Sequence, residues 1–409
     1  MIRRPGAILA LLTGLNLLNY LDRLVVSAVL PKVQEELGLS NFVGGLLATV
    51  FLVGYMVTSP VFGALGDRTR RVALIALGIV VWSAATVGSG LATGAASLIA
   101  ARALVGVGEA SYATLAPTVI DDVTPQDRKG RALAIFYAAT PVGAALGYLV
   151  GGFVEKAAGW RAAFFVAGGP GLLLALVCLL IAEPERKARV TKAAVARDLK
   201  TLVAIPLYRK GVAGYCAYTA AIGAFSFWAP KFLYAHYRLP LAEANFKFGL
   251  VLVVAGTAGT LVGGSWGDRA ANRFVKLEPE LRERSAIGAQ LRVCAVGSLV
   301  GAPLAAVCFL SPSATMFFAV VFFAILFLFL GTSPINAVIL RAGPSELRAS
   351  AMALSILAIH VLGDLWSPAL VGLLADHLPI HLAMMALPLS IGLSAWLWWP
   401  RALGAPRPA

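Results

Sequence analysis

Apolar stretches long enough to cross a lipid bilayer recur along almost the whole of this 409-residue sequence. A helix needs roughly 20 mostly apolar residues to span the hydrocarbon core. Only 13% of the residues are charged, whereas a soluble domain spends about 25% of its residues on charge. A soluble fold would need one buried helix after another and almost no surface helices. The sequence therefore predicts an all-α integral membrane protein.

Twelve apolar segments can be marked, and two longer polar segments, 183–208 and 267–287, interrupt them. The first polar segment divides the spans six and six, which predicts two six-helix bundles over 1–182 and 209–409. The apolar segments run approximately over 7–30, 42–65, 72–91, 96–120, 131–153, 161–182, 209–235, 246–266, 288–310, 313–340, 349–374 and 380–400.

The distribution of lysine and arginine predicts the orientation. Of the 34 such residues, 26 fall in the two termini and in the loops after the even-numbered spans. Cytoplasmic loops carry this excess, so both termini of this multi-pass protein are expected in the cytoplasm. The segment 183–208 is then a cytoplasmic linker, which could include a basic amphipathic helix on the membrane surface.

A short motif repeats at the same place in both halves. The six residues Gly63 to Arg68 follow the second span, and the similar residues Gly264 to Arg269 follow the eighth, 201 positions later. This indicates a tandem repeat, and two parallel six-helix repeats are the architecture of major facilitator superfamily transporters.

The loop 63–71 resembles the superfamily's signature between spans two and three. Its glycines allow a tight turn, and Asp67 could cap a helix N-terminus. The resemblance implies a cytoplasmic gate formed by Asp67, Arg68 and Arg71, with Asp268 and Arg269 as the repeat counterparts. The alternative is that the arginines only determine topology.

Five charged residues lie inside predicted spans, namely Asp22, Arg23, Arg102, Glu109 and Asp364. A charge at the bilayer centre costs roughly 2.5–3.5 kcal/mol or more unless it is paired or hydrated. Such residues are functional candidates. The alternatives are a buried ion pair that only fixes helix packing, or a charge near the interface whose side chain reaches the headgroups.

Arg102 and Glu109 are seven residues apart, so they share one helix face about 10 Å apart along the axis. Gly106 and Gly108 between them would let a neighbouring helix approach. The Asp22–Arg23 pair is a plausible partner for either residue. Asp22 and Glu109 are therefore candidate proton carriers, and Arg102 would tune them or hold an anionic substrate group. The sequence leaves open which carboxylate carries the proton.

In span eleven, His360 and Asp364 are four residues apart and share a helical face. A histidine–aspartate pair can exchange protons near neutral pH, although such a histidine can equally be a packing residue. Asn336 has no obvious local partner and is a candidate cavity residue, as are Arg23, Tyr20 and Trp228.

These motifs resemble the Spinster family of lipid transporters. The resemblance covers most of the chain. It implies alternating access, with Asp22 and Glu109 as protonatable sites and Arg102 as their partner. Eukaryotic members are associated with sphingosine-1-phosphate or lysophospholipid transport. The chain here is compact in a prokaryotic way, so a bacterial inner (plasma) membrane is expected and a lysosomal address is not. The matching stretches are Asn19 to Arg23, Gly63 to Arg71, Arg102 to Pro117, Phe227 to Lys231, Pro334 to Asn336, and His360 to Pro368.

The leading prediction is a secondary active transporter, driven by a proton gradient, for an amphiphilic lipid-like or organic anion. The runner-up is a multidrug/proton antiporter, which would use the same carboxylates on cationic or neutral amphiphiles. No phosphate-binding loop occurs in the sequence, which disfavours an ATP-driven pump. A channel is disfavoured by the carrier-type repeat.

A membrane enzyme is also disfavoured, because the four histidines have no metal-ligand spacing. No cofactor and no metal are expected. The net charge of +14 forms no basic stripe with interleaved aromatics, so no nucleic-acid partner is expected. The expected partners are a small amphiphilic substrate and the lipid bilayer, and the protein is expected to act as a monomer.

Overall fold

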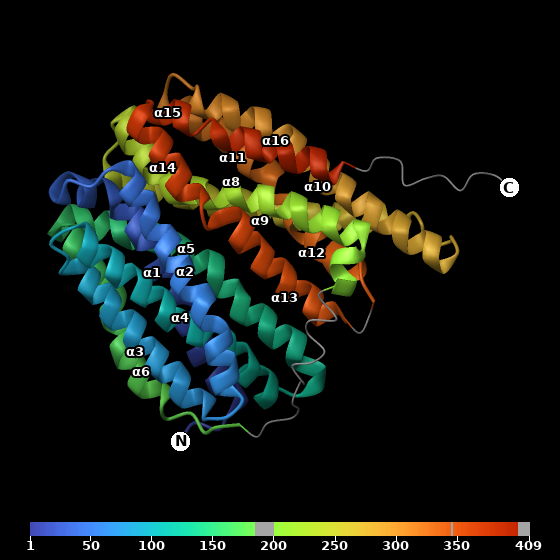
Figure 1. Cartoon of the computed structure of the whole chain (residues 1–409), viewed down its shortest axis with the longest axis horizontal. Helices are drawn as coiled ribbons and strands as arrows, with labels where there is room; N and C mark the ends of the chain where they lie inside the picture. The colour runs from blue at the N-terminus through green and yellow to red at the C-terminus, as the bar shows by residue number, and fades with distance from the viewer. Residues whose placement is uncertain (185–199, 345–346, 400–409) are drawn as a thin grey trace. The chain divides into compact units, whose positions relative to one another are not determined.

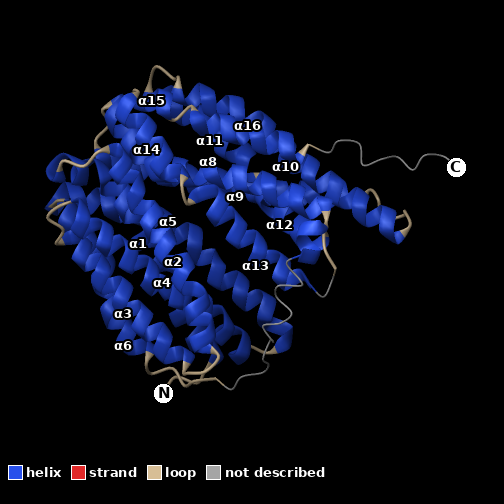
Figure 2. Cartoon of the chain, viewed as in Figure 1, coloured by secondary structure: helices blue, strands red, loops and turns tan. Residues whose placement is uncertain are grey.

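The structure is a computed structural model that describes residues 1–184, 200–344 and 347–399. In these ranges the regular elements are helices, apart from an isolated bridge between Ile2 and Ile181 (Figure 2). The described residues contain twelve helical spans that are long and apolar enough to cross a membrane, some of them built from more than one helix. The predicted all-α class and the twelve spans are therefore confirmed.

The helices follow the predicted segments, and several of them extend one turn or more beyond the predicted limits. In the first half they are α1 (Pro5–Leu37), α2 (Asn41–Gly66), α3 (Arg71–Gly90), α4 (Ala95–Val123), η1 (Gln126–Arg128), α5 (Lys129–Ala158) and α6 (Trp160–Cys178). In the second half they are α8 (Pro206–Tyr237), α9 (Leu241–Asn272), α10 (Pro279–Phe309), α11 (Ala314–Phe329), α12 (Thr332–Arg341), α13 (Arg348–Ile359), η3 (His360–Asp364), α14 (Ser367–His377), α15 (Ile380–Ala383) and α16 (Ala386–Trp398).

The chain forms two compact units (Figure 1). Unit 1 contains the described residues of Met1–Val190 together with Phe227–Leu250 and Pro368–His377. Unit 2 contains those of Thr191–Ser226, Val251–Ser367 and Leu378–Ala409. The predicted division into 1–182, a linker and 209–409 stays a prediction. Residues 185–199 of that linker, including its expected amphipathic helix, lie outside the described residues.

Glycines allow the helices of unit 1 to pack closely. Here α1 packs mainly on α5, α2 on α4, and α3 on α4 and α6. A side chain on Gly66, at the end of α2, would overlap Leu115 of α4. In unit 2 a Cβ on Gly267 of α9 would lie 2.9 Å from Cγ of Pro334 in α12. The motif repeated in the sequence thus makes equivalent contacts, between spans two and four and between spans eight and ten.

In unit 1, parts of α8 and α14 are held to α1 and α2 by polar contacts. The Ser27 hydroxyl on α1 donates to the carbonyl oxygen of Phe227 at 2.5 Å. Both oxygens of the Asp376 carboxylate on α14 accept from the first amides of α2, those of Asn41 at 2.7 Å and Phe42 at 2.9 Å. The Lys231 ammonium on α8 donates to Gln34 Oε1 at 2.5 Å and also contacts Asn41. The bonds of Asp376 and Lys231 gather at the end of the unit where α1 passes into α2.

Two predicted spans are interrupted in the structure. Span ten consists of α11 and α12, which are separated at Leu330 and Gly331. Span eleven contains the π-helix His360–Asp364 between α13 and α14. A π-helical turn is a local change in the hydrogen-bond ladder that hydropathy does not reveal.

Candidate functional site

Four charged side chains of unit 1 come together between α1 and α4. Asp22 and Arg23 lie on α1, while Arg102 and Glu109 lie on α4. Three of them are almost fully enclosed, with exposed fractions of 1% for Asp22, 1% for Arg102 and 0% for Glu109. Two anions and two cations cancel formally, which lowers the cost of burying the charges.

The closest contact in this cluster is an ion pair between the two helices. Arg23 Nε lies 2.6 Å from Glu109 Oε2. The expected contact between span one and span four is therefore present. Such a pair is strongly destabilised when one partner is removed, because the other charge stays buried.

Asp22 is only partly hydrogen-bonded. Its Oδ2 accepts from the hydroxyl of Thr86, on α3, at 2.5 Å. Its Oδ1 is buried and has no hydrogen-bond partner among the described residues. A carboxylate in this state can take a proton on Oδ1 without losing a hydrogen bond within unit 1.

Arg102 is a buried cation with few direct bonds. Its Nε and Nη1 have no hydrogen-bond partner within the described part of the chain. Its guanidinium carbon lies 5.2 Å from the ring centre of Phe51, on α2. The guanidinium carbon of Arg23 lies 5.0 Å from the same centre, and 4.9 Å from that of Tyr20. Aromatic faces attract cations at these distances, so the rings help to hold both arginines.

The glycines between Arg102 and Glu109 set the position of α4 against its neighbours. A side chain on Gly106 would overlap the carbonyl oxygen of Phe51 on α2. A Cβ on Gly108 would lie 2.5 Å from the backbone nitrogen of Trp82 on α3. Both of these atoms belong to the backbone of the neighbouring helix. They can move only if that helix shifts, which costs free energy.

Gly106→Ala is expected to destabilise the protein by about 3 kcal/mol, because α2 and α4 must separate to admit the methyl group. Gly14→Ala is the matched control. A Cβ at that position in α1 meets nothing within 4 Å, so the change should be neutral or slightly stabilising. Thermal melting of the detergent-purified variants measures both effects. Equal melting temperatures for the two variants would contradict the close approach of α2 and α4 at Gly106.

The predicted gate residues on the loop between α2 and α3 have different surroundings. Arg71 is buried and lies 2.6 Å from Asp122 Oδ2 and 3.3 Å from Glu183 Oε1. Asp67 was expected at a helix N-terminus, but it occupies the C-cap position of α2. The carboxylate of Glu183 accepts from the first two amides of α3, at Arg71 and Val72. The residue that caps α3 therefore comes from the segment after α6.

The remaining gate candidates are exposed. Arg68 lies in the same loop as Asp67, while Asp268 and Arg269 lie within α9 of unit 2. Their gate role stays a prediction.

In unit 2 the predicted His360–Asp364 contact is present. His360 Nδ1 lies 2.9 Å from Asp364 Oδ1. Thr219 of α8 donates to the carbonyl oxygen of Ile359 at 3.2 Å, where the π-helix begins. Asn336 has a local partner that the sequence did not indicate, because its amide donates to the carbonyl oxygen of Thr332 at 2.8 Å.

Trp228 lies in unit 1 and is fully enclosed. Its indole Nε1 donates to the carbonyl oxygen of Pro368 at 2.9 Å. The ring therefore joins α8 to α14, and its role in a substrate cavity stays a prediction.

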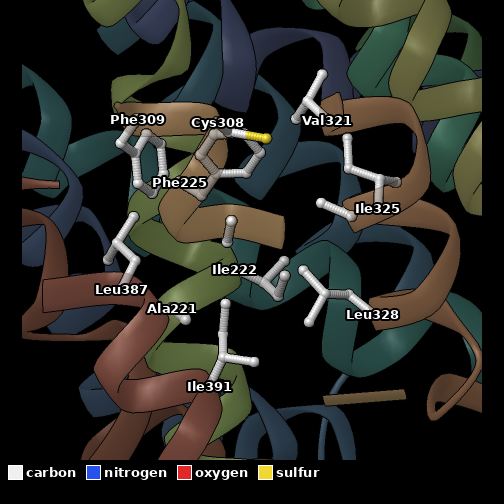
Figure 3. Close-up of a pocket in the computed structure, with 12 residues that line it drawn as sticks. Ala221, Ile222, Phe225, Cys308, Phe309, Val321, Ile325, Leu328, Leu387 and Ile391 are labelled. Atoms are coloured by element: carbon white, nitrogen blue, oxygen red, sulfur yellow. The ribbon is translucent and has the colours of Figure 1, made fainter. Parts of the chain in front are cut away.

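Unit 2 also contains a small apolar cavity of about 20 Å³ (Figure 3). It lies between α8, α10, α11 and α16, and Phe225, Cys308 and Ile325 are among its lining residues. No charged side chain of the described residues lines it. Such a cavity stays dry and offers nothing to hold a charged substrate.

Three residues of the charge cluster were missed by sequence reasoning. They are Thr86, Phe51 and Tyr55, whose ring centre lies 5.2 Å from the Arg23 guanidinium carbon. A threonine or an aromatic residue in an apolar span gives no functional signal by itself. No group of three possible metal ligands occurs among the described residues.

Comparison with known protein families finds two family models that match parts of the chain. A model described as the Major Facilitator Superfamily matches residues 12–277, and one described as the Organic Anion Transporter Polypeptide (OATP) family matches residues 305–381. Among solved structures, a bacterial homologue of the human lysosomal transporter Spinster, in an inward-facing and unoccupied conformation, gives a TM-score of 0.85 at 21% identity and covers 98% of this chain and 97% of its own. A D-xylose–proton symporter gives 0.78 at 16% identity, covering 97% of each chain.

Three curated relatives are similar to this chain over about nine tenths of its length. The chain is 34% identical over 382 residues to protein spinster of Drosophila melanogaster, covering 90% of this chain and 61% of that protein. It is 34% identical over 407 residues to protein spinster homolog 1 of Homo sapiens, covering 92% and 74%. It is 32% identical over 412 residues to "Probable sphingolipid transporter spinster homolog 2" of Arabidopsis thaliana, covering 91% and 81%. The chain thus spans less than two thirds of the length of the Drosophila protein.

These findings define a secondary transporter of the major facilitator superfamily, and not an enzyme. Within that superfamily the chain belongs to the Spinster family. The predicted family is confirmed.

Proposed function

We propose that this protein is a proton-coupled carrier for an amphiphilic lipid-like or organic anion. One observation carries the proposal, namely the buried cluster of Asp22, Arg23, Arg102 and Glu109. It is formally neutral when both carboxylates are ionised, and its Arg102 guanidinium is buried with two nitrogens unpartnered within the described residues.

The coupling follows from charge balance. When either carboxylate takes a proton, the cluster carries one excess positive charge, which favours an anionic group near Arg102. When the proton leaves, the carboxylate again neutralises the arginine. The affinity of the site for the anion then falls. Binding of the proton and binding of the anion are thereby linked, and the linkage is reciprocal. Asp22 and Glu109 are the candidate proton carriers, and no cofactor is invoked.

The chemistry of the site and the named relatives support the class of substrate. Two cations surrounded by aromatic rings suit a compact anionic headgroup attached to an apolar body. The Arabidopsis relative is named as a sphingolipid transporter, and the match at residues 305–381 is to a family named for organic anions. A multidrug/proton antiporter is the second candidate, because the rings of Tyr20, Phe51 and Tyr55 would also suit a cationic amphiphile.

We further propose alternating access by a monomer in a bacterial inner membrane. The twelve spans among the described residues would put both termini on one side, and the distribution of lysine and arginine supports the cytoplasm as that side. The polar contacts of Asp376 and Lys231 at the opposite end of unit 1 would then close the extracytoplasmic side. Asp67, Arg68 and Arg71, with Asp268 and Arg269, are the proposed cytoplasmic gate.

A thermal-shift screen of the purified protein tests the substrate class. Lysophospholipids and sphingoid phosphates should raise the melting temperature, and the shift should be lost in Arg102→Gln. Matched amphiphiles without the phosphate serve as controls. Stabilisation by cationic drugs alone would reject the anion carrier and support the antiporter.

A further inference from the structure

One end of unit 2 carries two adjoining hollows. The larger, of about 620 Å³, lies where α8 begins, beside the start of α10 and the end of α12. The smaller, of about 360 Å³, lies between the end of α9, the start of α10 and the start of α13. Arg341 and Glu283 line both hollows, so the two form one groove.

The groove is strongly basic. Its lining includes Arg282, Arg284, Arg341 and Arg348, against one carboxylate among the described residues, that of Glu283. All four arginines are exposed. None of them forms an ion pair with a described carboxylate. The guanidinium groups are therefore available to an external anion.

The arginines lie at helix ends, outside the part of each helix that the hydrocarbon core needs. The 31 residues of α10 extend about 46 Å, whereas the core is about 30 Å thick. Arg282 and Arg284 lie in the first two turns of α10, while Arg341 ends α12 and Arg348 begins α13. These positions correspond to the level of the lipid headgroups.

The same groove also has apolar lining residues. Ile205, Leu207 and Leu281 line the larger hollow, and Val275, which is 50% exposed, lines the smaller. A groove lined by both arginines and apolar side chains complements a molecule with an anionic head and a hydrocarbon tail. A soluble phosphate would use only the arginines.

A related hollow occurs at the repeat-equivalent place in unit 1. It measures about 460 Å³ and is lined by Pro5 at the start of α1, by Pro125, and by Arg128 and Arg131. Pro5 and Pro206 are 201 positions apart, which is the offset of the tandem repeat. The recurrence indicates that the arrangement of the helix ends builds the hollow, and unit 2 adds more arginine to it.

We propose that the unit 2 groove binds an anionic phospholipid of the surrounding leaflet. The headgroup phosphate lies among Arg282, Arg341 and Arg348, and the acyl chain lies against Leu207 and Leu281. Basic pockets between membrane helices are known to take such headgroups. The lipid is a bound partner at this site and not the transported substrate.

Native mass spectrometry of the full chain, released from detergent, tests the proposal. Phosphatidylglycerol is titrated against phosphatidylethanolamine of the same acyl composition, with inorganic phosphate as a separate arm. The wild type should retain phosphatidylglycerol preferentially. The double variant Arg341→Gln with Arg348→Gln should bind phosphatidylglycerol more weakly, by roughly fivefold for each arginine removed.

Arg273→Gln is the matched control, because Arg273 is an exposed arginine nearby that lines neither hollow. It should leave lipid retention unchanged. If the glutamine variants fail to fold, Arg341→Lys keeps the charge and should keep most of the preference. Equal retention of the two lipids, an equal loss in Arg273→Gln, or binding of inorganic phosphate without lipid preference would each overturn the proposal.

Discussion

Replacing Glu109 by glutamine is expected to abolish the response of transport to a pH gradient. For one proton per substrate, a gradient of one pH unit supports about tenfold accumulation, and the variant should show about onefold. The reason is that glutamine has nearly the shape of the carboxyl group but cannot exchange a proton. The measurement is uptake of NBD-labelled sphingosine 1-phosphate into proteoliposomes.

Two further variants make this result specific. Glu243→Gln is the control, because Glu243 forms an exposed pair with Lys247 on α9, at 2.6 Å. It should accumulate the probe like the wild type. Asp22→Asn tests the second carboxylate of the cluster. If Glu109→Gln still accumulates the probe tenfold while Asp22→Asn does not, Asp22 alone carries the proton. If both respond normally, coupling through this cluster is wrong.

Replacing Arg23 by glutamine is expected to cost about 3–5 kcal/mol of stability, because the Glu109 carboxylate is left buried without its partner. The wild-type Arg23–Glu109 distance is 2.6 Å, and the glutamate side chain is fully enclosed. Thermal melting in detergent measures the loss. The double variant Arg23→Gln with Glu109→Gln should recover much of it, since the uncompensated charge is removed.

The exposed Lys247–Glu243 pair is again the comparison. Lys247→Gln should change stability by less than about 1 kcal/mol, because water solvates the remaining charge. Equal melting temperatures for Arg23→Gln and Lys247→Gln would contradict a stabilising role of the Arg23–Glu109 ion pair. A double variant no more stable than Arg23→Gln would contradict it as well.

Much of the fold was predictable because a bilayer imposes one simple requirement on each span. Length and apolarity marked the twelve spans, and the Gly-Asp-Arg motif at Gly66 and Gly267 revealed the repeat. The interruptions of spans ten and eleven were not predictable. They depend on local hydrogen bonds, such as that from Thr219 to the carbonyl oxygen of Ile359, which leave no trace in hydropathy.

The charge cluster was predictable in outline, because charged residues in apolar spans are rare. Sequence spacing placed Arg102 and Glu109 on one face and suggested the Asp22–Arg23 pair as their neighbour. The choice of Arg23 as the partner of Glu109 depends on how α1 and α4 pack, which spacing alone does not give. The role of Thr86, which donates a hydrogen bond to Asp22, could not be predicted for a different reason. A threonine in a helix commonly bonds its own backbone.

The most direct test of the central claim is proton movement that accompanies the substrate. Proteoliposomes containing the wild-type protein and a pH-sensitive dye receive NBD-labelled sphingosine 1-phosphate with no imposed gradient. Proton-coupled transport predicts a change in internal pH that is absent from protein-free liposomes and from Glu109→Gln. Transport of the probe with no change in internal pH would contradict proton coupling.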